Sequence, residues 1–138
     1  MVSSGKGQAA FEYMVIVVIV MMFIIPLWYY GMQTRQGVSG DLSISYAKNT
    51  AMKITQTADL LYSQRENASI RIMIHIPDGV QYTNIANRSV LIVVATPSGN
   101  VTVLEQSKAN ITGTIPTVKG DYYYMMRAMG DYVNITAS

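Results

Sequence analysis

The sequence predicts an α+β fold, in which a long N-terminal hydrophobic helix precedes a small antiparallel β-sandwich-like globular domain. Three observations predict this fold. Residues 13–34 contain no charged side chain, residues 44–61 repeat apolar side chains at helical spacing, and residues from 67 onward alternate apolar and polar side chains. We therefore expect a helix over 8–65 and a β-rich head domain over 66–138.

The first element is a helix of membrane length, which we place at residues 8–34. From residue 13 to residue 32, every side chain except Pro26 and Gly31 is apolar or aromatic. About 20 helical residues at about 1.5 Å per residue span about 30 Å, the thickness of a bilayer core. Pro26 cannot donate a backbone hydrogen bond, so we expect a kink there and further loosening over residues 31–40, which contain three glycines.

The second half of the helix, residues 41–65, is amphipathic. Its apolar positions lie three and four residues apart: Ile44, Ala47, Ala51, Ile54, Ala58 and Leu61. Polar side chains occupy the other faces. The stripe covers fewer than three heptads, so it predicts a face packed on a sheet rather than a coiled coil.

The remaining residues read as short strands. We predict six: 70–76, 90–96, 101–104, 111–115, 122–127 and 132–136. Isoleucines alternate with Arg71, Met73 and His75 in the first strand, which predicts one buried face. The second is a nearly continuous apolar run and is expected to be a central strand buried on both faces. Short strands at this spacing are typical of a small sandwich.

The composition excludes several functions. Charged residues make up 13% of the chain and its net charge is only +2, which argues against nucleic-acid binding. The absence of cysteine excludes disulfides and thiolate metal sites, and the single histidine, His75, excludes multi-histidine metal sites. Motifs of metalloproteases, calcium loops and phosphate loops are also missing. We expect neither an enzyme nor a cofactor.

The hydrophobic helix has three possible interpretations. A secretory signal would be followed by a small-residue cleavage site, and the residues after this apolar run do not supply one. A plain membrane anchor is possible, although Glu12 at its start would be costly near lipid without a partner. In the third interpretation, the helix is held in the membrane first and later packs against copies of itself, where Glu12 finds its partner.

The residues just before the apolar run resemble the class III signal peptide of archaeal type IV pilins and archaellins. In that family, a prepilin peptidase cleaves after a Lys-Gly or Arg-Gly pair and before a Gln, and a Glu follows four residues later. The matching positions are Lys6, Gly7, Gln8 and Glu12. Ala10 and Ile16 replace the Ser and the Leu of the family pattern.

The resemblance implies cleavage between Gly7 and Gln8, which would remove residues 1–7 as a leader peptide. The precursor would lie in the cell membrane, and an assembly ATPase and a membrane platform protein would build the mature chain into an extracellular homopolymer. The motif looks more like that of an adhesion pilin than that of an archaellin. A motility filament subunit and a non-polymerising, membrane-anchored binding module remain the alternatives.

The β-rich part contains five N-x-[S/T] tripeptides, the acceptor pattern for N-linked glycans: Asn67, Asn87, Asn100, Asn110 and Asn134. The composition would give roughly one such tripeptide by chance, so the excess favours a glycoprotein. Glycosylation also agrees with the translocation that the N-terminus implies.

Overall fold

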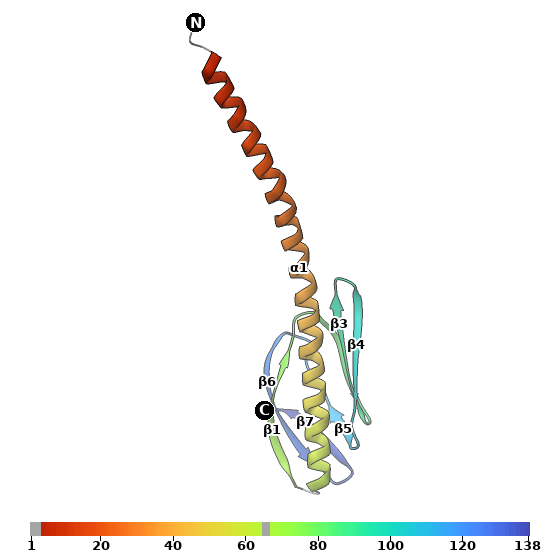
Figure 1. The fold of residues 1–138 in the computed structure, drawn as a ribbon. Coiled ribbons are helices and arrows are strands. Elements are labelled where there is room, and N and C mark those ends of the chain that lie inside the picture. The colour runs from red at the N-terminus through yellow and green to blue at the C-terminus, as the bar shows by residue number, and fades with distance from the viewer. Residues whose placement is uncertain (1–3, 65–66) are drawn as a thin grey trace. The chain divides into compact units, whose positions relative to one another are not determined.

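The computed structural model describes residues 4–64 and 67–138, without the side chains of residues 4–6 and 34–38. The chain forms two compact units, Met1–Val38 and Ser39–Ser138. Helix α1, Ser4–Gln64, contributes to both units, and the seven strands of the described residues belong to the second (Figure 1). The predicted α+β class is confirmed.

In the first unit, α1 carries an apolar stretch that covers Gly7–Gln33. Pro26 lies inside the helix, and the helix also continues through residues 31–40. A proline removes one hydrogen bond, which a long helix of this kind tolerates. The loosening expected at Pro26 and over residues 31–40 therefore does not end the helix.

The second unit contains two β-sheets. The larger has the strand order β1-β6-β7-β5, formed by Ser69–Ile76, Gly120–Ala128, Tyr132–Ala137 and Asn110–Gly113. The smaller has the order β2-β3-β4, formed by Val80–Ala86, Ser89–Thr96 and Gly99–Gln106. The expected all-antiparallel arrangement needs one correction, because β5 and β7 are parallel. The chain leaves β5, crosses to β6 and returns antiparallel in β7, so β5 and β7 run in the same direction.

Two strand predictions differ from the structure. The sequence pattern does not predict β2, because only Val80 of this strand is buried and a register shift between Val80 and Tyr82 interrupts its pairing with β3. The prediction that β3 is buried on both faces is wrong. Val90, Ile92 and Val94 are buried, whereas the residues between them are half-buried, because the core covers one face of this sheet.

The C-terminal part of α1, from Ser39 onward, supplies the centre of the core, as the apolar stripe predicts. Five of its buried side chains are apolar and have no exposed surface: Ala47, Ala51, Ile54, Ala58 and Leu61. They pack in one cluster with the inward-facing side chains of both sheets, and Figure 1 shows this part of the helix running alongside the strands. Three of the five are alanines, which allow the strands to lie close to the helix axis.

Candidate membrane and assembly segment

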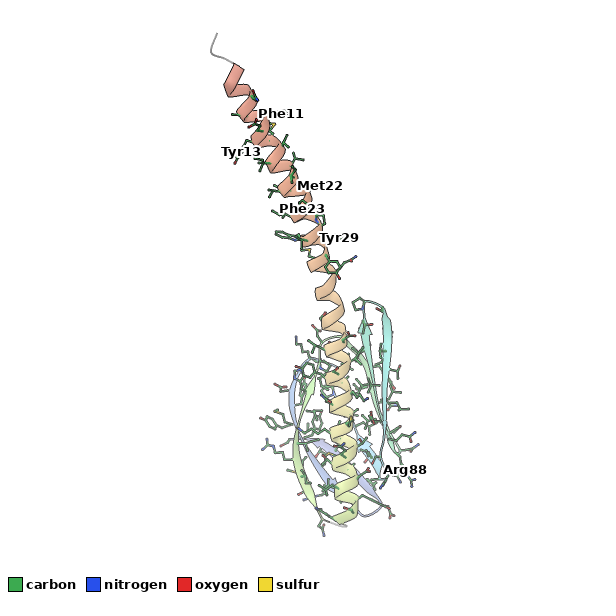
Figure 2. The ribbon with its side chains drawn as sticks, in the orientation of Figure 1. Phe11, Tyr13, Met22, Phe23, Tyr29 and Arg88 are labelled. Carbon is green, nitrogen blue, oxygen red and sulfur yellow. The ribbon has the colours of Figure 1, made fainter. Side chains whose placement is uncertain are left out.

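The candidate functional site is the apolar stretch of α1 in the first unit. Every large apolar side chain between residues 11 and 32 is exposed, with exposed fractions from 40% at Val17 to 73% at Met22. Figure 2 shows Phe11, Tyr13, Met22 and Phe23 projecting from the helix. By length and composition this helix could cross a membrane, and none of its most apolar window is buried within the chain.

The exposed apolar surface covers the whole circumference of the helix. One side bears a shallow groove lined by Met21, Ile24, Ile25, Trp28, Tyr29 and Met32, which recur at helical spacing. The opposite side carries Ile16, Ile19 and Phe23, in line with Glu12 at intervals of three and four residues. A helix that is apolar on all faces needs apolar surroundings on all faces, which a bilayer or a bundle of helices supplies.

The residues of the predicted cleavage motif lie at the start of this helix. Gly7, Gln8 and Glu12 are helical and exposed, and a Cβ atom on Gly7 would meet nothing within 4 Å. The side chain of Lys6 and residues 1–3 lie outside the described part of the chain. The bond between Gly7 and Gln8 therefore lies in the first turns of α1, where a helix opens most easily.

In the second unit, a cluster of polar side chains joins α1 to strand β1. Thr50 Oγ1 donates a hydrogen bond to the His75 carbonyl (2.6 Å), and Lys53 Nζ donates to the Met73 carbonyl (2.8 Å). The His75 ring contacts the carboxylate of Asp121 across the β1–β6 pair at 2.5 Å and lies edge-on to Tyr46. Sequence reasoning placed His75 on the polar face of its strand but did not find Asp121, which only the strand register brings opposite.

The five predicted glycan acceptors lie in different backbone settings. Asn67 and Asn87 have positive φ angles of 73° and 55°, a conformation that Asn tolerates better than most residues. Asn100 and Asn110 are exposed at the starts of β4 and β5, whereas Asn134 is half-buried within β7. Four of the five side chains are therefore exposed in the folded unit.

No known protein family, curated protein or solved structure matches this chain. The described residues nevertheless define a class of molecule. It combines one membrane-length helix, exposed on every face, with a β-rich unit that has its own apolar core.

Proposed function

We propose that this chain is a pilin, the structural subunit of an extracellular archaeal type IV pilus-like filament used in adhesion. The observation that carries the proposal is the apolar stretch Gly7–Gln33, whose large apolar side chains are all exposed in the part of the chain that the structure describes. The cleavage motif at Gly7 and Gln8 supports the same function, because removal of residues 1–7 leaves the apolar stretch on the mature protein.

The energetics favour two successive apolar environments for this segment. Burying one large apolar side chain stabilises a protein by about 1.5–3 kcal/mol, so the segment as a whole represents on the order of tens of kcal/mol. Lipid covers this surface before assembly, and the equivalent helices of neighbouring subunits cover it afterwards. Because leaving lipid is itself costly, assembly requires the ATPase and the membrane platform protein that the resemblance implies.

Glu12 gives the packed helices a register. A buried carboxylate without a partner costs several kcal/mol, so a neighbouring donor strongly favours one alignment. After cleavage, the new amino group of Gln8 lies about one helical turn from Glu12 along the sequence. The amino group of one subunit therefore pairs with the Glu12 carboxylate of the next.

The second unit forms the outer layer of the proposed filament. Its exposed tripeptides at Asn67, Asn87, Asn100 and Asn110 would carry glycans on a surface with few charges. Such a glycosylated layer keeps the filament soluble and presents it for attachment.

The test compares processing with assembly in cells that express the full chain. Gly7→Val should block removal of residues 1–7, measured by mass spectrometry of the mature N-terminus, whereas the matched control Gly5→Val should be processed. Glu12→Gln should be processed but should yield few filaments by negative-stain microscopy of sheared cell surfaces. Normal filaments from Glu12→Leu would remove Glu12 from the mechanism.

The same experiment separates the pilin from an anchored binding module. A functional protein that retains residues 1–7, or a processed protein that never enters a filament, would contradict the proposal.

A further inference from the structure

Strand β4 presents a long backbone edge. It pairs with β3 on one side and is the last strand of its sheet. The Ser107 N–H donates to the Arg88 carbonyl (2.8 Å). Arg88 and Ser107 continue the register in which Thr96 pairs with Gly99 and Ser89 pairs with Gln106. The odd-numbered residues of β4 are therefore bonded to β3, and four residues direct their backbone groups away from it: Asn100, Thr102, Leu104 and Gln106.

The other outermost strands of the two sheets contact further parts of this unit. The carbonyls along the outer edge of β1 accept hydrogen bonds from Thr50 and Lys53 of α1. On the side of β2, Thr83 Oγ1 donates to the Ile115 carbonyl (2.7 Å), and β2 lies beside β5. Within the described residues, no comparable bond reaches the outward backbone groups of β4.

The sequence of β4 carries few of the features that protect an exposed edge. Natural edge strands commonly carry lysine, proline or a bulge that prevents pairing with another chain. Gly99–Gln106 contains none of these, and its pairing with β3 runs without a register shift. Its one charged residue is Glu105, and Leu104 on its outer face is 51% exposed.

We propose that the β4 edge binds β4 of a second copy of this chain, forming an antiparallel pair centred on Val103. This register sets all four outward-directed residues opposite one another, so that Thr102 faces Leu104 of the second copy. Glu105 then lies opposite Val101, which keeps the two carboxylates from facing each other. The core-facing sides of the two three-stranded sheets lie on the same side of the joined sheet, which then has six strands.

This contact does not depend on the proposed function. It sets Asn100 opposite Gln106 of the second copy, so it and a glycan on Asn100 exclude each other. A two-fold contact closes on itself, so it produces pairs of chains and cannot by itself propagate a filament. If the chains are assembled into filaments, the β4–β4 contact would join the second units of two filaments that lie side by side. The N-terminal motif and its cleavage play no part in it.

The absence of cysteine makes disulfide trapping a direct test on the full chain in detergent micelles. The chain is produced without N-linked glycans, because Thr102 also completes the acceptor tripeptide of Asn100. Thr102→Cys with Leu104→Cys places thiols directly opposite in a hydrogen-bonded pair, at a Cα separation of about 5.5 Å that a disulfide can span. Leu104→Cys alone leaves the two thiols on a diagonal of about 7–8 Å. We expect mild oxidation to link most of the double variant into dimers on a non-reducing gel and to leave the single variant largely monomeric.

Asn84→Cys is the matched control, because Asn84 is equally exposed on β2, away from the β4 edge. It should remain monomeric. A double variant that stays monomeric, or a control that dimerises as quickly, would overturn the proposal, and efficient dimerisation of Leu104→Cys alone would overturn the register. As a second measurement, Thr102→Lys with Leu104→Lys puts like charges opposite and should abolish the dimer in size-exclusion chromatography, whereas Asn84→Lys should not.

Discussion

Asp59 is the residue of α1 whose removal should most weaken the attachment of the helix to the β4–β5 connection. Its Oδ1 atom accepts hydrogen bonds from Ser107 Oγ (2.6 Å) and from the Lys108 backbone N–H (2.7 Å). Ser107 is buried and also accepts a bond from the Ala109 N–H (3.1 Å). A hydrogen bond to a charged group contributes about 1.5–3 kcal/mol. Because Asp59 is half-buried, we expect Asp59→Ala to lower the free energy of unfolding by about 2–3 kcal/mol in total.

That loss is large against the 5–15 kcal/mol that typically stabilise a domain. For a unit of this size, it corresponds to a fall in Tm of roughly 10–20 °C. Circular dichroism of the full chain in detergent, followed through the strand signal during heating, measures the shift. Asp59→Asn is the control, because its amide oxygen can still accept both bonds, and it should lose much less. Equal Tm values for the alanine variant and the unmodified chain would refute the assigned role of Asp59.

Two further predictions concern the larger sheet. At Gly113, where φ is 146°, an added Cβ would lie 2.6 Å from the Ile135 carbonyl oxygen, so Gly113→Ala should destabilise the unit by about 3 kcal/mol or more in chemical denaturation. Gly99→Ala, with φ of 126° and open space around its Cβ, should cost only the backbone strain, and a loss equal to that of Gly113→Ala would contradict this account. Burial, and then the neighbouring Tyr122, raises the pKa of Tyr124. The folded state therefore favours the protonated form of Tyr124. The contribution of Tyr124 to the free energy of unfolding is complete below the ordinary tyrosine pKa of about 10 and is lost as pH rises through the raised pKa. Tyr124→Phe should flatten this alkaline loss of stability, and an unchanged pH dependence would exclude Tyr124 as its source.

Hydrophobic periodicity was sufficient to predict most of the fold. The stripe from Ala47 to Leu61 is buried because three- and four-residue spacing keeps these side chains on one face of the helix. Ile72, Ile74 and Ile76 of β1 are buried for the corresponding reason, since alternate residues of a strand share a face. Where side chains supply no such contrast, prediction failed, as in β2 with its single buried residue.

Features that depend on contacts between distant residues could not be predicted from periodicity. Neither the parallel pairing of β5 with β7 nor the position of Asp121 opposite His75 leaves a local pattern. The same applies to Asp59 and its contact with Ser107, which lies 48 residues away along the chain. The candidate site, in contrast, could be predicted from the sequence, because it consists of a continuous apolar stretch and a short motif.

The change of pattern along α1 bears on which function the molecule supports. Downstream of Ser39, the helix buries one apolar stripe, as a helix packed on a sheet does, and its other faces carry polar side chains together with four exposed apolar or aromatic ones, Leu42, Tyr46, Leu60 and Tyr62. Between Gly7 and Gln33, the apolar residues surround the axis, and Glu12 is the one carboxylate among them. A permanent membrane anchor needs only the apolar residues, and the Glu12 carboxylate near lipid would destabilise it. A helix that later packs among identical helices gains from Glu12, because a single buried carboxylate with a donor on the neighbouring chain selects one register out of many nearly equivalent apolar ones.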